Sequence, residues 1–244
     1  MKSIIILASF IGFTTTVFGQ NIIKTLSQFE IKQNGKTLVG LKNTEGKIII
    51  PAKYAGLIIE KDYVFAEDYN GDYTYIDSTA KIICKYGLFS DFSSGVSVVT
   101  KYANLKDKNE NIGVHGLMNK SGKMVVPFGV YSSYQYKGFL NGYCVVTVGK
   151  TGEVGVTKYG LIDSLGTVIL KPIFRMMHPP SEGMVAIQDV DTKRWGYANL
   201  KGEIVIPTIY FWVSPSFKNG IADVDTEGVF KGRIKIDKTG KKLQ

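Results

Sequence analysis

The chain repeats one short phrase along most of its length. Four of its copies are GLKNTEGKIIIPAKY from Gly40, GLMNKSGKMVVPFGV from Gly116, GLIDSLGTVILKPIF from Gly160 and GYANLKGEIVIPTIY from Gly196. Aligned on one glycine of the phrase, the spacings between six copies are 34, 42, 44, 36 and 38 residues, and the aligned residues are Gly46, Ala80, Gly122, Gly166, Gly202 and Gly240. Repeats of this period are typical of proteins built as a stack or a ring of supersecondary units.

Each copy also carries Asn or Asp three residues before the aligned position, at Asn43, Asp77, Asn119, Asp163, Asn199 and Asp237. A short side chain of this kind at the first turn position accepts a hydrogen bond from the backbone two residues on, and glycine at the fourth position tolerates a positive φ. The pattern therefore predicts hairpin turns at residues 43–46, 77–80, 119–122, 163–166, 199–202 and 237–240. The three aspartates are interpreted as turn formers and not as catalytic acids, because the other units have Asn there.

The segments around these turns predict β-strands. Apolar and mostly β-branched runs follow the turns, as in IIIP ending at Pro51 and IVIP ending at Pro207. Because proline cannot donate to a β ladder, it should mark either the end of pairing or an edge strand. An aromatic residue, a Phe-x-x-Gly segment and another apolar run come next, as in FKNGIADV from Phe217. Each unit is predicted to have about three short strands, with no amphipathic helix after residue 19.

Together these elements resemble the WG-type (KWG) β-repeat family. That family's Trp-Gly pair, Asx-x-x-Gly turn, VIPxxY run and FxxGxAxV segment are most complete in RWGYANLKGEIVIPTIY and SFKNGIADV, between Arg194 and Val224. In the other units the tryptophan position holds Val39, Tyr73, His115, Tyr159 and Arg233. The resemblance covers roughly residues 36–242. It implies an all-β fold of tandem antiparallel hairpins in a protein of a commonly secreted or envelope-associated family.

Two arrangements of the units fit the sequence, a closed β-propeller and an open, twisted, solenoid-like array. Blades commonly need four strands and about forty residues, which exceeds the three short strands predicted here. The lysine-rich end KIDKTGKKLQ and the polar start of the repeats suit the caps of an open array. We therefore expect an open array of about five and a half repeats at residues 37–244, after a lead-in or cap at residues 20–36.

Residues 1–19 have the features of a secretory signal peptide. Lys2 is followed by an apolar run too short to span a bilayer, and Val17 and Gly19 precede the expected cleavage point before Gln20. The protein is therefore expected to be exported to the periplasm, the cell envelope or the extracellular space. Its formal net charge of +9 attracts anionic partners at long range without defining a site.

The other reactive residues occupy positions that packing explains. Cys84 and Cys144 align with apolar or small residues of other units, so both are expected to be buried, and whether they form a disulfide stays open. His115 fills the tryptophan position, and His178 has no second histidine at metal-ligand spacing. Since no catalytic, phosphate-binding or metal-binding motif is present, we expect no enzymatic activity and no cofactor.

The parts that do not repeat are the candidates for function. Lysine-rich insertions precede His115 and Gly160, and loops on a rigid β scaffold commonly carry recognition. We therefore expect a non-enzymatic scaffold that binds a protein or a cell-envelope polymer, with no nucleic-acid partner and no integral membrane segment in the exported chain. A glycan-binding module that uses exposed aromatic side chains is the alternative, and a hydrolase with a loop-built site is a third reading. The candidate binding residues are Lys101, Lys106, Lys108, Tyr134, Tyr136 and Trp212.

Overall fold

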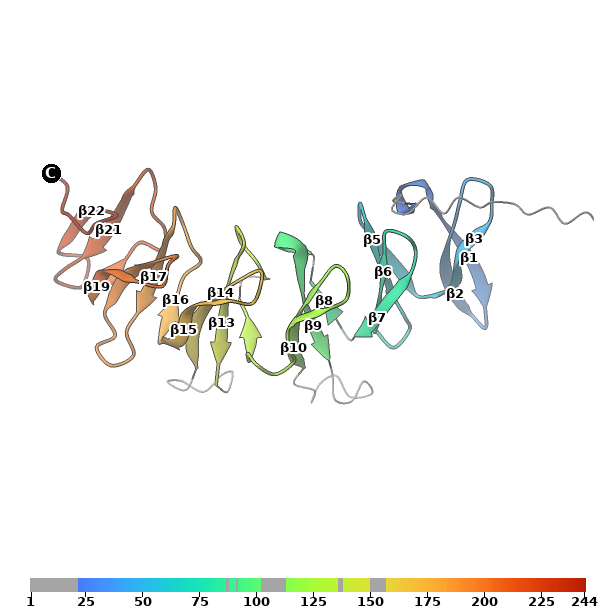
Figure 1. The fold of residues 1–244 in the computed structure, drawn as a ribbon, viewed down its shortest axis with the longest axis horizontal. Helices are drawn as coiled ribbons and strands as arrows, with labels where there is room; N and C mark the ends of the chain where they lie inside the picture. The colour runs from blue at the N-terminus through green and yellow to red at the C-terminus, as the bar shows by residue number, and fades with distance from the viewer. Residues whose placement is uncertain (1–21, 87, 91, 102–112, 136–137, 150–156) are drawn as a thin grey trace, which may run out of the picture.

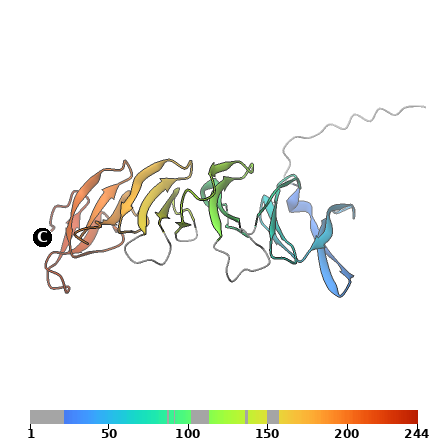
Figure 2. The same cartoon turned by 90° about the horizontal axis from the view of Figure 1, so that it is seen from below.

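Six small antiparallel sheets stand in a row, with the first and the last at opposite ends (Figures 1 and 2). The structure is a computed structural model, and it describes residues 22–86, 88–90, 92–101, 113–135, 138–149 and 157–244. Two short 3-10 turns, Ile23–Thr25 and Ser93–Gly95, are the only helical elements of this described part, which confirms the all-β prediction. The expected signal peptide at residues 1–19 lies outside it. No helix in the described ranges has the length and apolar character needed to cross a membrane.

The strands fall into the six sheets in chain order. The first three sheets contain β1 (Ser27–Gln33), β2 (Lys36–Lys42) and β3 (Ile48–Tyr54); β4 (Gly56–Ile59), β5 (Tyr63–Glu67), β6 (Tyr73–Asp77) and β7 (Ile82–Tyr86); and β8 (Leu88–Phe89), β9 (Val96–Lys101), β10 (Val114–Asn119) and β11 (Met124–Val126). The last three contain β12 (Ser133–Tyr134), β13 (Tyr143–Val148), β14 (Lys158–Asp163) and β15 (Val168–Phe174); β16 (Met176–Met177), β17 (Met184–Gln188), β18 (Trp195–Asn199) and β19 (Ile204–Tyr210); and β20 (Trp212–Val213), β21 (Ile221–Asp225) and β22 (Arg233–Asp237).

Four of the six sheets have four strands, so the prediction of about three strands per unit is wrong for them. The strand that was missed follows the aromatic residue of each phrase. In the fifth sheet it is the two-residue strand β16, which pairs with β17. A strand of two residues shows no periodicity in the sequence, because alternation needs a longer run to be visible. β1, within the expected lead-in at residues 20–36, pairs with β2 along its whole length.

The array is open, as predicted. β1 pairs only with β2 and β22 only with β21 among the described strands, and the two terminal sheets are far apart in Figure 1. The strand count offered as the reason for an open array does not hold, since four-stranded units are present. The array is open because successive sheets stack in a row and the last sheet does not return to the first.

Five buried hydrophobic clusters hold the six sheets together, one between each consecutive pair. Alternate side chains of a strand point to opposite faces, so one sheet contributes to two clusters. In the fifth sheet Ala186 belongs to the cluster shared with the sixth sheet, whereas Val185 belongs to the cluster shared with the fourth. Each unit is therefore stabilised mainly by its two neighbours, as in other repeat proteins.

A turn forms at each of the six positions where the sequence places Asn or Asp. At residues 199–202 the N–H of Gly202 donates to the carbonyl of Asn199 at 3.2 Å, and the Asn199 Oδ1 accepts the N–H groups of Lys201 and Glu203. The fourth residue has a positive φ in all six turns, including 63° at Ala80. Gly202 meets a second constraint, because a Cβ on it would lie 2.5 Å from the carbonyl oxygen of Ile169 in the preceding sheet.

The proline after the apolar run lies inside the strand in β3 and β19, whereas β11 ends at Val126, directly before Pro127. β19 continues through Pro207 to Tyr210, with a bulge between the pairs Trp195↔Tyr210 and Tyr197↔Ile206. β19 is an edge strand, which is the second outcome that the proline predicted. Gly196, of the Trp-Gly pair, lies directly beneath the bulge, and a Cβ there would collide with the carbonyl oxygens of Ile206 and Pro207. The bulge explains why this position of the phrase needs glycine.

Candidate functional site

The structure does not bring the predicted aromatic binding residues together. Tyr134 lies in the fourth sheet and Trp212 in the sixth, while Lys106, Lys108 and Tyr136 lie outside the described residues. The Tyr134 ring packs edge to face on Tyr131 at 5.8 Å, its hydroxyl is buried without a hydrogen-bond partner in the described chain, and burial raises its pKa. Lys101 is exposed at the end of β9.

The histidines and cysteines contact neighbouring side chains. His115 Nδ1 lies 2.9 Å from Thr100 Oγ1, and His178 stacks on Trp195 with ring centroids 5.3 Å apart. Burial lowers the pKa of both imidazoles. Cys84 and Cys144 are free thiols in different sheets, and burial raises their pKa to about 11 and about 12. Within the described ranges no three His, Cys, Asp or Glu side chains are grouped to hold a metal ion.

The variable loops share one edge of the array, which we call the hairpin-loop edge. It consists of the connection between β1 and β2 and the connections between the equivalent strand pairs of the other sheets, and its described members are residues 34–35, 68–72, 189–194 and 226–232. Because all six sheets contain this strand pair and each stacks on the previous one, the described connections leave the sheets at equivalent positions. The two predicted insertions fall mostly on residues 102–112 and 150–156, which follow β9 and β13 in the sequence and lie outside the described residues.

An aspartate organises three of the described loops of this edge, at residues 68–72, 189–194 and 226–232. Asp68 and Asp189 each accept backbone N–H groups from their own loop. Asp225 is 1% exposed, and its carboxylate accepts four N–H groups of its loop, from Glu227, Gly228, Phe230 and Gly232. Burial opposes ionisation of Asp225, but the four donors outweigh it and hold its pKa below 3.8. Sequence reasoning missed these aspartates, although each lies at the end of a strand or directly after it.

The loop that Asp225 holds presents apolar side chains to solvent. Val229 and Phe230 have φ of 53° and 59°, a conformation that β-branched and bulky residues rarely adopt, and they are 84% and 57% exposed. Phe230 packs edge to face on Trp212 with ring centroids 5.8 Å apart. The loop therefore carries a preformed apolar tip at the C-terminal end of the hairpin-loop edge.

Two arginines lie over aromatic rings beside this tip. The guanidinium carbon of Arg194 is 3.1 Å from the centre of the Phe211 ring, and that of Arg233 is 4.6 Å from Phe230 and 5.0 Å from Trp212. A Cβ on Gly228 would lie 3.0 Å from the Phe211 ring, so the loop also packs against Phe211. The aromatic–arginine patch is defined as Arg194, Phe211, Trp212, Phe230 and Arg233.

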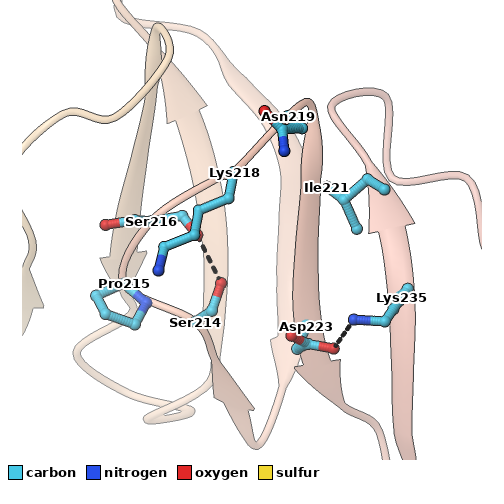
Figure 3. Close-up of a pocket in the computed structure, with 8 residues that line it drawn as sticks. All are labelled: Ser214, Pro215, Ser216, Lys218, Asn219, Ile221, Asp223 and Lys235. Carbon is cyan, nitrogen blue, oxygen red and sulfur yellow. Dashed lines mark hydrogen bonds and ion pairs between the residues drawn. The ribbon is translucent and has the colours of Figure 1, made fainter.

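A separate polar pocket of about 490 Å³ lies on the outer face of the last sheet (Figure 3). In it the Lys235 ammonium lies 3.0 Å from the Asp223 carboxylate on the adjacent strand. The equivalent residues of the fifth sheet are Tyr197 and Ala186, which pack against the next unit. The lining is Ser214, Pro215, Ser216, Lys218, Asn219, Ile221, Asp223 and Lys235. Polar residues thus cap the face on which a further sheet would stack.

Comparison with solved structures finds several proteins of low similarity. BamB from Moraxella catarrhalis is 11% identical with a TM-score of 0.33, and the match covers 90% of this chain and 70% of BamB. A eukaryotic initiation factor is 13% identical with a TM-score of 0.45, covering 93% of this chain and 65% of the factor. Hsv2p from Kluyveromyces lactis is 11% identical with a TM-score of 0.34, covering 86% and 71%. All three scores are below 0.5, so no argument rests on these likenesses.

No curated protein matches this chain in sequence. The family described as WG containing repeat does match it, at residues 116–151, 159–189 and 195–229. These three segments overlap strands of the third to sixth sheets and include the Asx turns at residues 119–122, 163–166 and 199–202 and the Trp-Gly pair. With three consecutive matched segments in a row of stacked antiparallel sheets, residues 116–229 are repeats of the WG β-repeat family.

Proposed function

We propose that this protein is an exported, non-catalytic scaffold that binds a protein or a cell-envelope component through its hairpin-loop edge. The observation that carries the proposal is the repetition of the loops at equivalent positions of stacked sheets. Loops from separate units can then contact one extended partner at the same time. Binding through several weak contacts raises the overall affinity without a deep pocket at any one of them.

The rigidity of the scaffold supports the same function. Five hydrophobic clusters hold the sheets in sequence, and buried or hydrogen-bonded aspartates hold three of the described loops. A loop that is already ordered loses little conformational entropy on binding, which favours affinity. The unit-to-unit variation lies mainly in loop length and sequence, where change leaves the stacked cores intact.

A non-catalytic role is favoured by what the repeated carboxylates do. Asp77, Asp163 and Asp237 each accept the N–H groups of the residues two and four positions on. The same geometry occurs at Asn43, Asn119 and Asn199. A side chain that an amide replaces without change of geometry is a turn former, which cannot depend on proton transfer.

Affinity capture with loop variants tests the proposal. The purified protein and two variants, with residues 102–112 or 150–156 replaced by short Gly-Ser linkers, are immobilised and exposed to a cell-envelope fraction. We expect a partner that the intact protein retains and at least one loop variant loses. The matched control is Lys201→Gln, which changes an exposed turn residue at the opposite ends of the central strands. A partner bound equally by all forms would contradict binding through this edge.

Export is tested separately. Cells that express the full chain are fractionated, and the mass of the recovered protein is measured. We expect recovery outside the cytoplasm with the mass of a chain that begins at Gln20. An intact chain that keeps Met1 and stays in the cytoplasm would contradict export and leave the binding experiment to be interpreted on its own.

A further inference from the structure

The guanidinium groups of the aromatic–arginine patch are held in place but lack acceptors. Neither Arg194 nor Arg233 forms a side-chain hydrogen bond or an ion pair with the described residues, and one terminal nitrogen of Arg194 is buried without a partner. A buried donor without an acceptor costs free energy. Arg233 is exposed, and its N–H groups, like the other guanidinium N–H groups of Arg194, have no acceptor in the described chain and can receive one from outside it.

The geometry of an arginine on an aromatic ring determines which acceptor fits. The ring covers one face of the guanidinium, while the N–H groups lie in the guanidinium plane and stay available at its edge. A carboxylate matches this fork with two parallel hydrogen bonds, and such charge-assisted pairs are stronger than neutral ones. Arg194 and Arg233 flank the loop at residues 226–232, so two acidic groups of one ligand could be bound on either side of the tip.

The apolar tip supplies the second half of the recognition. Val229 and Phe230 are exposed in a conformation that is unfavourable for their side chains, and the four hydrogen bonds to Asp225 maintain it. Strained backbone that the surroundings hold in place is common at functional sites. Aromatic and arginine side chains are also the ones that contribute most to binding at protein interfaces.

We propose that the aromatic–arginine patch binds an acidic peptide segment of a protein partner. Asp or Glu side chains of the segment bond Arg194 and Arg233, and a large apolar side chain between them packs on Val229 and Phe230. This inference rests on the proposed scaffold function and names the partner class at the C-terminal end of the hairpin-loop edge. Glu227 and Asp191 are exposed beside the arginines. An anionic bilayer would contact the two arginines and these two carboxylates together, and the carboxylates would repel it. A peptide can place its own carboxylates against the arginines alone.

The test uses a randomised peptide library displayed on phage and selected on the full-length protein. We expect the enriched sequences to combine Asp or Glu with a large apolar residue, and the corresponding synthetic peptides to bind in solution. Arg194→Gln and Arg233→Gln should each weaken that binding by about tenfold, the loss of one charge-assisted pair. Arg233→Lys should restore it only in part, since lysine keeps the charge but not the fork. Replacing the acidic residues of a peptide by Gln or Asn should abolish the arginine dependence.

The control for lost charge is Lys171→Gln, an exposed lysine on β15 outside the patch, which should bind like the unchanged protein. Circular dichroism of every variant checks that the fold is kept. Enriched peptides without acidic residues, or binding insensitive to both arginine variants, overturns the proposal. Tighter binding to vesicles of phosphatidylglycerol than to any selected peptide overturns it in favour of a membrane. Variants with residues 102–112 or 150–156 replaced should still bind the peptides, so failure of the proposed scaffold function is seen separately.

Discussion

The carboxylate of Glu182 accepts the backbone N–H of Gly220 at 2.9 Å, across the interface between the fifth and sixth units. It also accepts the N–H of Asn219 at 2.7 Å and lies 3.1 Å from the Lys238 ammonium. Glu182 lies in the tight turn before β17, and Gly220 lies in the tight turn before β21. The Glu182 side chain therefore joins the last two units outside their hydrophobic cluster. At the interface between the third and fourth units, the N–H of Gly142 donates to Ser94 Oγ at 3.1 Å.

Replacing Glu182 by Gln should lower the thermal stability of the protein. The hydrogen bond from Gly220, with those from Lys238 and Asn219, holds the pKa of Glu182 below its ordinary value of 4.5. When folding lowers the pKa of an acid, the ionised form of that acid stabilises the folded protein. This stabilisation is complete above the unfolded-state pKa and is lost as the pH falls through the folded-state pKa. The melting temperature of the Gln variant should therefore differ from that of the unchanged protein near neutral pH and converge with it in acid below pH 4.5.

The control is Glu45→Gln, in the first Asx turn, whose side chain forms no hydrogen bond with the described residues. It should melt like the unchanged protein. Equal melting curves for the Glu182 variant and the unchanged protein at neutral pH would refute a role of this contact in stability.

Alanine at Gly202 should cost more than alanine at Gly46, although both glycines have nearly the same positive φ, 86° and 83°. The backbone conformation alone costs about 1–2 kcal/mol for a residue with a Cβ. At Gly202 the new methyl group also collides with the Ile169 carbonyl of the preceding unit, which adds roughly 1–3 kcal/mol, whereas nothing lies within 4 Å at Gly46. Urea unfolding measures the two free energies, and similar losses would show that the glycine is needed for the turn alone.

Tyr197→Phe should destabilise the last interface by about 1–2 kcal/mol. The hydroxyl of Tyr197 donates to the carbonyl of Ser214 at 2.6 Å, so its removal leaves that carbonyl without this donor. Tyr210→Phe is the matched control, because its hydroxyl forms no hydrogen bond with the described residues although the ring is only 7% exposed. Urea unfolding compares the two variants, and an equal effect of both would contradict a specific contribution from this bond.

Asp225→Asn should loosen the loop at residues 226–232 without unfolding the scaffold. The amide keeps one acceptor oxygen, whereas both carboxylate oxygens are needed for the four N–H groups. Limited digestion with trypsin should then cut faster after Lys231. Asp223→Asn, which removes only the ion pair with Lys235, should leave the rate unchanged. Equal resistance of the two variants would mean that Asp225 does not hold the loop.

Neither cysteine should react readily while the protein is folded. Reaction requires the thiolate, and burial raises the pKa of Cys84 to about 11 and that of Cys144 to about 12. A thiol-specific colour reagent at neutral pH should label both slowly in the native state and detect two thiols per chain after unfolding without reductant. Thiols that appear only after reduction would show that Cys84 and Cys144 form a disulfide.

The six Asx turns show how much of the fold can be predicted from local sequence. Asn199 and Gly202 lie three residues apart, and the hydrogen bonds that define their turn involve backbone atoms of the same short segment. The proline of the phrase predicted either a strand end or an edge strand, and local sequence could not decide between the two. Pro207 lies in a bulge whose geometry depends on the partner strand and on Gly196, so the sequence near the proline could not predict that pairing continues.

The aromatic–arginine patch could not be predicted from the sequence. Arg194, Phe211, Phe230 and Arg233 come from two sheets and from connections separated by many residues, and none of them belongs to the repeated pattern in a way that marks a site. The sequence indicates Trp212 as a candidate because of its aromatic ring, but it does not show that Arg233 lies over that ring. The patch exists because stacking brings the ends of neighbouring units together.

The sequence by itself determined the repeat, its six turns, the all-β class and the polar end, since each depends on side chains within a few residues of one another or on their alternation. Only the tertiary structure decided the number of strands per sheet, the open row and the residues that meet along the hairpin-loop edge. Those features depend on contacts between sheets, where burial of one face against the next unit sets the spacing and orientation of the stack.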